Sequence, residues 1–156
     1  MVAEGKKAPS FTLPDKDGSK YRLASSEADY TVLFFYPKDN TPGCTIEAKE
    51  FSKDINKFKK LNVEVVGVSG GDVDSKVKFA KKHKLKTRLL ADKDFKVSQK
   101  YGFYGKKSFM GKTFNGIKRS TVILDKNRKV IKVFDRVKPR GHSKEVLEFI
   151  RSLTSQ

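Results

Sequence analysis

The sequence predicts an α/β fold in which helices flank a central mixed β-sheet. Continuous apolar runs such as Thr31–Tyr36 are typical of strands that are buried on both faces. Segments with apolar residues at intervals of three or four alternate with these runs, as amphipathic helices do. Two later apolar runs are separated only by the polar turn 125–128, which indicates an antiparallel hairpin and therefore a mixed sheet.

The strands and helices are expected to belong to a single domain that covers residues 1–156. The turn 14–18 contains Pro, Asp and Gly, which favour tight turns, so the chain should begin with an N-terminal β-hairpin. The expected strands are Ser10–Leu13, Lys20–Leu23, Thr31–Tyr36, Val63–Val68, Thr87–Ala91, Ser120–Leu124 and Lys129–Phe134. The apolar stripes of the expected helices are Ala48, Phe51, Ile55 and Phe58, then Val73, Val77, Ala80 and Leu85, and finally Val146, Leu147, Ile150 and Leu153 within Ser143–Leu153.

The segment Gly102–Gly116 fits neither period. It contains four glycines and four aromatic residues with lysines between them. We predict a long ordered loop here, and loops of this length in compact domains often have a function. Its aromatic residues could line a substrate pocket, bind a partner or simply pack against the sheet.

The chain is strongly basic, because 35 Lys and Arg against 18 Asp and Glu give a net charge of +17. Such a charge attracts anions, including nucleic acid and acidic lipid, but lysines between apolar positions are also typical of a solvated surface. No apolar run approaches the roughly 20 residues that a membrane span needs. The N-terminus shows no apolar signal segment, so we expect a cytoplasmic protein, and we expect a monomer because no apolar patch is recognisable.

Cys44 is the only cysteine in the sequence. A single cysteine excludes an internal disulfide and a C-x-x-C dithiol, and with two histidines it makes a four-ligand zinc site implausible. His83 lies among lysines and His142 precedes the last expected helix, so neither has a metal-binding partner nearby in sequence. We therefore expect no metal and no cofactor.

Cys44 lies where the first long helix begins, after the most hydrophobic strand. Thr41 suits the N-cap and Pro42 the first helical position, which makes Gly43 the second and Cys44 the third. Free backbone N–H groups and the positive end of the helix dipole favour an anion in this turn. Cys44 is therefore expected to ionise readily, and Gly43 leaves its N–H open to a small ligand. The alternative is an inert, buried cysteine.

At these residues the sequence resembles the peroxiredoxins, and within them the bacterioferritin-comigratory (BCP) or PrxQ group. The family signature Pro-x-x-x-Thr/Ser-x-x-Cys is present as Pro37, Thr41 and Cys44, within FFYPKDNTPGCTIEAKEF. A second segment, GKKSFMGKTFNGIKRSTVILD, resembles the one that delivers the family's active-site arginine, which corresponds to Arg119. The resemblance runs from about Gly5 to Leu153. It implies a thioredoxin fold with an N-terminal extension, and reduction of hydrogen peroxide and organic hydroperoxides.

The resemblance also implies a role for each matched residue. Cys44 attacks a peroxide oxygen and becomes a sulfenic acid, and Arg119 stabilises the thiolate and holds the substrate. Thr41 accepts a hydrogen bond from the peroxide, while the N–H groups of Gly43 and Cys44 donate to it. Pro37 covers the sulfur. These residues would carry the reaction.

The family segment also contains Tyr36 and Glu47, which are expected beside the site. Glu47 either orients the site or lies on the helix surface near the N-terminal dipole. One position departs from the family, because many members carry a resolving cysteine five residues after the first, where Lys49 stands here. We therefore infer a one-cysteine cycle, in which an external thiol (thioredoxin, glutaredoxin or glutathione) reduces the sulfenic acid through a mixed disulfide.

Two other functions are left as alternatives. Lysines interleave with Tyr104, Phe109 and Phe114, as they do in stacking platforms for nucleic acid. RNA-recognition motifs place such aromatic residues on strands of a four-stranded sheet, however, and here we expect them in a loop. The second alternative is a redox sensor that uses the same sulfenic acid to oxidise a partner.

Overall fold

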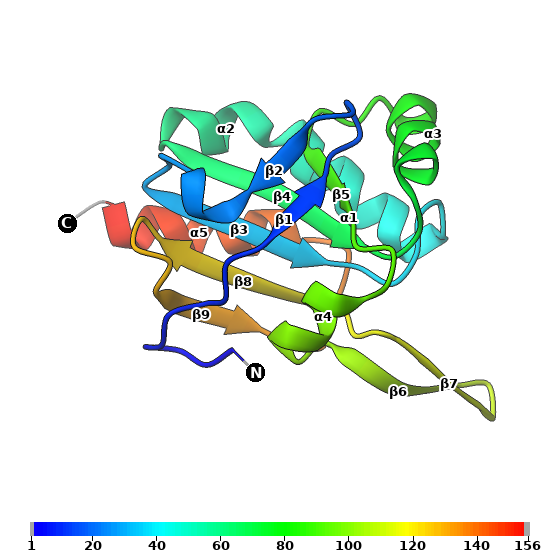
Figure 1. Cartoon of the computed structure of the whole chain (residues 1–156). Coiled ribbons are helices and arrows are strands. Elements are labelled where there is room, and N and C mark those ends of the chain that lie inside the picture. The colour runs from blue at the N-terminus through cyan, green and yellow to red at the C-terminus, as the bar shows by residue number, and fades with distance from the viewer. Residues whose placement is uncertain (1, 155–156) are drawn as a thin grey trace.

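The structure, a computed structural model, describes residues 2–154 and is built on a five-stranded sheet (Figure 1). The strands follow the order β5-β4-β3-β8-β9. Three are parallel neighbours, namely β3 (Tyr30–Phe35), β4 (Val63–Ser69) and β5 (Arg88–Ala91). The other two, β8 (Ser120–Asp125) and β9 (Val130–Phe134), join as antiparallel strands on the far side of β3. The predicted mixed sheet is confirmed.

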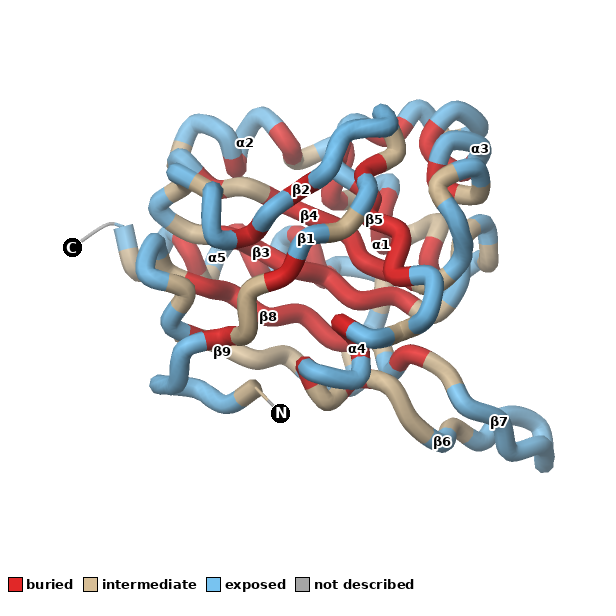
Figure 2. Tube along the Cα trace, in the orientation of Figure 1, coloured by how far each residue is buried: buried red, intermediate tan, exposed pale blue. Residues whose placement is uncertain are grey.

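Helices cover one face of this sheet. They are α1 (Pro42–Lys53), α2 (Ile55–Lys60), α3 (Val73–His83) and α5 (His142–Thr154). Because successive strand residues point to opposite faces, Val32 and Phe34 pack among these helices, whereas Leu33 and Phe35 belong to the core on the other side. Phe34 stacks on Phe51 of α1 with 4.6 Å between the ring centroids. Figure 2 shows the resulting buried layer along the sheet.

The second face is covered by the N-terminal hairpin of β1 (Thr12–Pro14) and β2 (Lys20–Arg22), the 3₁₀ helix η1 (Leu23–Ser25) and α4 (Lys96–Tyr101). The expected hairpin is therefore confirmed. The N-terminal segment also reaches both margins of the central sheet. Lys7 forms a bridge with Lys129 beside β9, and Asp15 forms one with Leu90 of β5. The same segment thus lies along two opposite edges.

One helical prediction is wrong, and one helix was not predicted. The apolar stripe from Ala48 to Phe58 predicts one helix, but the structure ends α1 at Lys53 and begins α2 at Ile55, with Asp54 between them. Helix α4 was not expected, because six residues are too few to show a period. The first turn of α4 is stabilised by the carboxylate of Asp92, which accepts hydrogen bonds from the backbone N–H groups of Val97 and Ser98.

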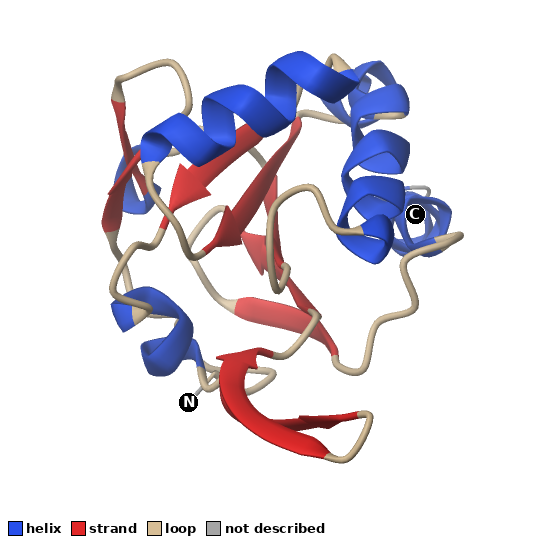
Figure 3. Cartoon of the chain, turned by 90° about the vertical axis from the view of Figure 1, so that its right-hand side faces the viewer, coloured by secondary structure: helices blue, strands red, loops and turns tan. Residues whose placement is uncertain are grey.

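The prediction of a long loop over Gly102–Gly116 is wrong. The segment forms a hairpin of β6 (Tyr104–Phe109) and β7 (Lys112–Ile117), which projects from the body of the molecule (Figures 1 and 3). Met110 and Gly111 both have positive φ and make the tight turn between the strands. The aromatic residues therefore do lie on strands, so the loop argument against nucleic acid fails. The hairpin is a two-stranded sheet, not the four-stranded sheet of RNA-recognition motifs.

The stripe predicted for α3 is also partly wrong, because Val77 is 40% exposed and the neighbouring Lys76 is fully buried. The reason is an ion pair, with 2.7 Å between Lys76 Nζ and Asp39 Oδ2. Burial lowers the pKa of Lys76, and the Asp39 charge opposes that shift. Asp39 lies in the loop between β3 and α1, so this pair fastens that loop to α3.

Lys76→Met should destabilise the fold by about 3–5 kcal/mol, because it leaves the carboxylate of Asp39 without its buried partner. The measurement is urea denaturation at neutral pH. Val77→Ala is the matched control on the same helix and should change the free energy of unfolding by about 0.5 kcal/mol or less. Equal effects of the two substitutions would show that the buried pair does not matter to stability.

Candidate active site

The first turn of α1 has the arrangement that the sequence predicts. Thr41 is the extended N-cap, Pro42 occupies the start of the helix, and Thr45 N–H donates to the Thr41 carbonyl at 2.9 Å. The Thr41 side chain does not cap the helix. Its hydroxyl instead donates to the Lys38 carbonyl at 2.9 Å, so its oxygen lone pairs can accept a hydrogen bond from a ligand.

Cys44 is buried, with 1% of its surface exposed. It belongs to the apolar cluster that contains Phe34, Tyr36 and Phe51. Burial of this kind fits the alternative of an inert cysteine. The charged groups around the sulfur distinguish the two interpretations.

Arg119 lies against the first turn of α1. Its Nη1 is 2.8 Å from Oε1 of Glu47, and its Nη2 lies 2.9 Å from the point where a Cβ on Gly43 would be. Burial acts to lower the pKa of Arg119, but the nearby negative charges of Cys44 and Glu47 outweigh it and raise that pKa above its ordinary value. The structure therefore brings Arg119 to Gly43, Cys44 and Glu47. Those three residues are close in sequence, whereas Arg119 is distant from them.

Glu47 is almost completely buried, which excludes the alternative of a helix-surface position and agrees with the expected position beside the site. Burial raises the pKa of Glu47 to about 7, although the adjacent Arg119 charge acts in the opposite direction. Its Oε1 accepts from Arg119, whereas Oε2 has no hydrogen-bond partner among the described residues. The carboxyl group thus sits near the midpoint of its titration at neutral pH.

Tyr36 packs in the same cluster as Cys44, and its hydroxyl is held by the loop before α1. The hydroxyl donates to Asp39 Oδ1 at 2.7 Å, and the ring stacks on Phe34 with 5.7 Å between centroids. Burial, reinforced by the Asp39 charge, raises the pKa of Tyr36 well above its ordinary value. The contribution of Tyr36 is therefore packing and anchoring of the loop. Pro37 follows it directly and is half-buried.

Two further residues at the site were not expected. Pro139, in the segment before α5, places its Cγ 3.3 Å from the point where a Cβ on Gly43 would be. Lys107 of β6 donates to the Ile117 carbonyl at 2.8 Å. Burial and the Arg119 charge lower the pKa of Lys107, while the Cys44 charge opposes this shift. Arg119 and Lys107 share the lining of a cavity of about 530 Å³.

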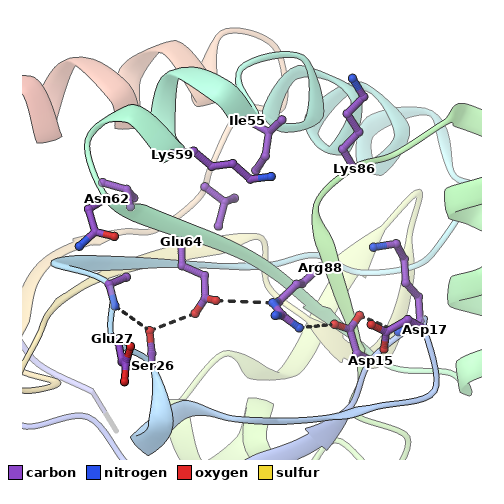
Figure 4. A pocket seen from close by; sticks show the side chains of 14 residues that line it. Asp15, Asp17, Ser26, Glu27, Ile55, Lys59, Asn62, Glu64, Lys86 and Arg88 are labelled. Atoms are coloured by element: carbon purple, nitrogen blue, oxygen red, sulfur yellow. Dashed lines mark hydrogen bonds and ion pairs between the residues drawn. The ribbon is translucent and has the colours of Figure 1, made fainter.

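A larger cavity, of about 670 Å³, contains none of these residues (Figure 4). The positive charge of Arg88 in this cavity is already neutralised, because its Nη1 lies 2.9 Å from Asp15 Oδ2 and its Nε lies 3.5 Å from Glu64 Oε2. Within residues 2–154, no group of three His, Cys, Asp or Glu side chains could hold a metal ion. No helix in that range is long and apolar enough to span a membrane.

Comparison with known proteins shows the family of the chain. A model of the AhpC/TSA family matches residues 4–133. The chain belongs to this family. Peroxiredoxin Bcp of Escherichia coli K12 is 38% identical over 144 residues, which are 92% of each chain. A putative peroxiredoxin Bcp of Helicobacter pylori J99 is 45% identical over 144 residues, covering 92% of this chain and 95% of the relative. The crystal structure of peroxidoxin BcpB from Mycobacterium tuberculosis has a TM-score of 0.86 at 32% identity, covering 98% and 99% of the chains.

The protein is thus a peroxiredoxin of the Bcp or PrxQ group, and its mixed sheet with flanking helices is the thioredoxin-type fold of these enzymes. Peroxiredoxins are thiol-dependent peroxidases, which are oxidoreductases. The resemblance and the fold class predicted from the sequence are confirmed.

Gly43→Ala should lower kcat/KM of this peroxiredoxin for hydrogen peroxide by about ten- to a hundredfold, because the new Cβ displaces the guanidinium of Arg119. The flexible end of Arg119 can move aside, so thermal stability should change little. Peroxide consumption with dithiothreitol is the readout. Lys49→Ala, at an exposed position of the same helix, is the control, and an equal loss in both variants would contradict the prediction.

Glu47→Gln should remove a pH dependence of stability. The folded-state pKa of about 7 lies above the ordinary 4.5, so the group favours folding below about pH 4.5 and loses this contribution as the pH rises through 7. The free energy of unfolding of the wild type, relative to Glu47→Gln, should therefore fall by at most about 3 kcal/mol between pH 5 and pH 8. Urea denaturation across this range measures the difference in unfolding free energy between the two proteins. A difference that does not change with pH would refute the prediction.

Proposed function

We propose that the protein reduces hydrogen peroxide and organic hydroperoxides through a sulfenic acid on Cys44, and that an external thiol then restores the enzyme. The observation that carries this proposal is the position of Arg119 against the first turn of α1, where its charge reaches both Cys44 and Glu47. An inert buried cysteine needs no guanidinium beside it. A thiolate does, because an unpaired charge is costly in an apolar cluster.

The groups around Cys44 support in-line attack on a peroxide. The thiolate attacks one oxygen, the O–O bond breaks, and the other oxygen leaves as water or alcohol after taking up a proton. Thr41 accepts a hydrogen bond from the peroxide, because its own hydroxyl proton is donated to Lys38. The N–H groups of Gly43 and Cys44 and the guanidinium of Arg119 stabilise the negative charge that develops on the oxygens. Pro37 shields the sulfur from one side.

Glu47 positions Arg119 rather than contacting the peroxide. Its Oε1 holds Nη1 at 2.8 Å, which leaves the rest of the guanidinium directed to the first turn of α1. Because one guanidinium faces two acidic groups, protonation of Glu47 near neutral pH leaves more of the Arg119 charge to the thiolate.

The second half of the cycle follows from the cysteine count. With Cys44 alone, no intramolecular disulfide can form, and Lys49 stands where many members of the group carry a resolving cysteine. An external thiol condenses with the sulfenic acid to release water, and a second thiol cleaves the mixed disulfide. This cycle consumes thiol and favours a reducing compartment such as the cytoplasm.

The test is peroxide consumption with dithiothreitol as the reductant. Wild type should turn over and Cys44→Ser should be inactive, because serine cannot supply the thiolate. Mass spectrometry after peroxide treatment without thiol should show one added oxygen on Cys44. Slow turnover with a stable mixed disulfide would instead support the redox sensor, and absence of turnover in the wild type would refute the enzyme.

A further inference from the structure

The projecting hairpin of β6 and β7 carries an unusual concentration of exposed apolar surface. Of the four large apolar side chains that are exposed in residues 2–154, three lie here: Phe109 at 67%, Met110 at 86% and Phe114 at 46%. Exposed aromatic groups gathered on one element are typical of an interaction surface. We call the side that carries the two phenylalanines the aromatic face.

The aromatic face follows from the strand register. Lys107 pairs with Phe114, and Phe109 pairs with Lys112, so each phenylalanine lies opposite a lysine. Because side chains alternate along each strand, all four residues share one face, while Lys106 and Ser108 lie on the other. A Cβ at Gly116 would lie 3.3 Å from Lys107 Cδ and 3.5 Å from Phe114 Cε2, which places both side chains over that glycine.

Through Lys107, the aromatic face borders the cavity that Arg119 also lines. Lys107 is close enough to Arg119 and Cys44 for their charges to affect it. Strand β7 ends at Ile117, two positions before Arg119. The hairpin therefore projects from the rim of the site.

The chemistry of the site gives a docked protein reductant an advantage. Cys44 is 1% exposed, and the cycle proposed above needs an external sulfur to reach it. A reductant that is held at the rim while the residues covering the sulfur move has a large advantage over one that meets it by chance.

We propose that the aromatic face docks a protein dithiol, whose reactive sulfur is surrounded by an apolar surface with acidic residues at its edge. This inference rests on the proposed function and names the reductant class of the same site. The acidic edge is required because residues 102–119 contain lysine and arginine but no Asp or Glu. The face extends for roughly 17 Å along β6, since six residues of a strand span that length, which suits a protein surface better than a tripeptide.

The docked partner reduces the Cys44 sulfenic acid with its two thiols. One thiol of the partner attacks the sulfur of the Cys44 sulfenic acid, and an S–S bond forms as water leaves with the thiol proton. The second thiol of the partner then attacks the partner's own sulfur in this mixed disulfide. Cys44 leaves as thiolate, and the partner is oxidised to a disulfide by two electrons.

The experiment compares two reductants on the same variants. Dithiothreitol is the small dithiol, and thioredoxin with its reductase and NADPH is the protein dithiol. Phe109→Ser combined with Phe114→Ser, and separately Lys112→Glu, should lower kcat/KM for thioredoxin by about tenfold or more. With dithiothreitol, both variants should stay within about twofold of the wild type, because a small thiol needs no docking surface.

Lys106→Glu is the matched control. It makes the same charge change on the same hairpin, but at an exposed position of the opposite face. It should keep kcat/KM for thioredoxin within about threefold of the wild type, because a more distant charge contributes less. Equal losses for Lys106→Glu and Lys112→Glu, or no loss in the aromatic variant, would overturn the proposal.

Two further outcomes would also overturn it. One is a wild type that turns over with dithiothreitol but not with thioredoxin. The other is unchanged thioredoxin kinetics in an aromatic variant that no longer binds duplex DNA at near-physiological salt, which would assign the face to nucleic acid. A wild type that does not turn over even with dithiothreitol would refute the proposed function itself, so the two failures are distinguishable.

Discussion

The site depends on a single guanidinium that is shared by two acidic groups. Arg119 is held by Glu47 at 2.8 Å and feels the charge of Cys44, and all three side chains are largely removed from water. In such surroundings a charge without a partner is costly, so the position of this guanidinium matters to the whole site. The missing side chain of Gly43 is part of the same arrangement, because it gives Arg119 room beside the helix start.

A second buried ion pair, between Lys76 and Asp39, holds the loop that precedes α1. The loop from Pro37 to Thr41 connects the central strand to α1 and would be free to move if only its ends were fixed. Asp39 prevents this, because it receives hydrogen bonds from Tyr36, Ser75 and Lys76. The position of the first turn of α1, which carries Cys44, is therefore linked to α3.

The strands and the helix start could be predicted because their signals are local: apolar runs such as Thr31–Tyr36, and Thr41 and Pro42 before Cys44. The burial of Lys76 could not, because its cause is Asp39 in a distant loop. The sequence left Glu47 either beside the site or on the helix surface, because its partner Arg119 is distant in sequence. The hairpin over residues 104–117 escaped detection because Phe109, Met110 and Phe114 are exposed, so no apolar stripe marks a buried side.

The N-terminal segment has a consequence for association between molecules. An open sheet ends in strands whose backbone groups can pair with another chain, and such pairing is a common beginning of aggregation. Here Gly5 N–H donates to the Val130 carbonyl at one margin, and Lys16 N–H donates to the Leu89 carbonyl at the other. The N-terminal segment thereby covers part of both margins of the central sheet, which hinders pairing of either edge strand with another chain.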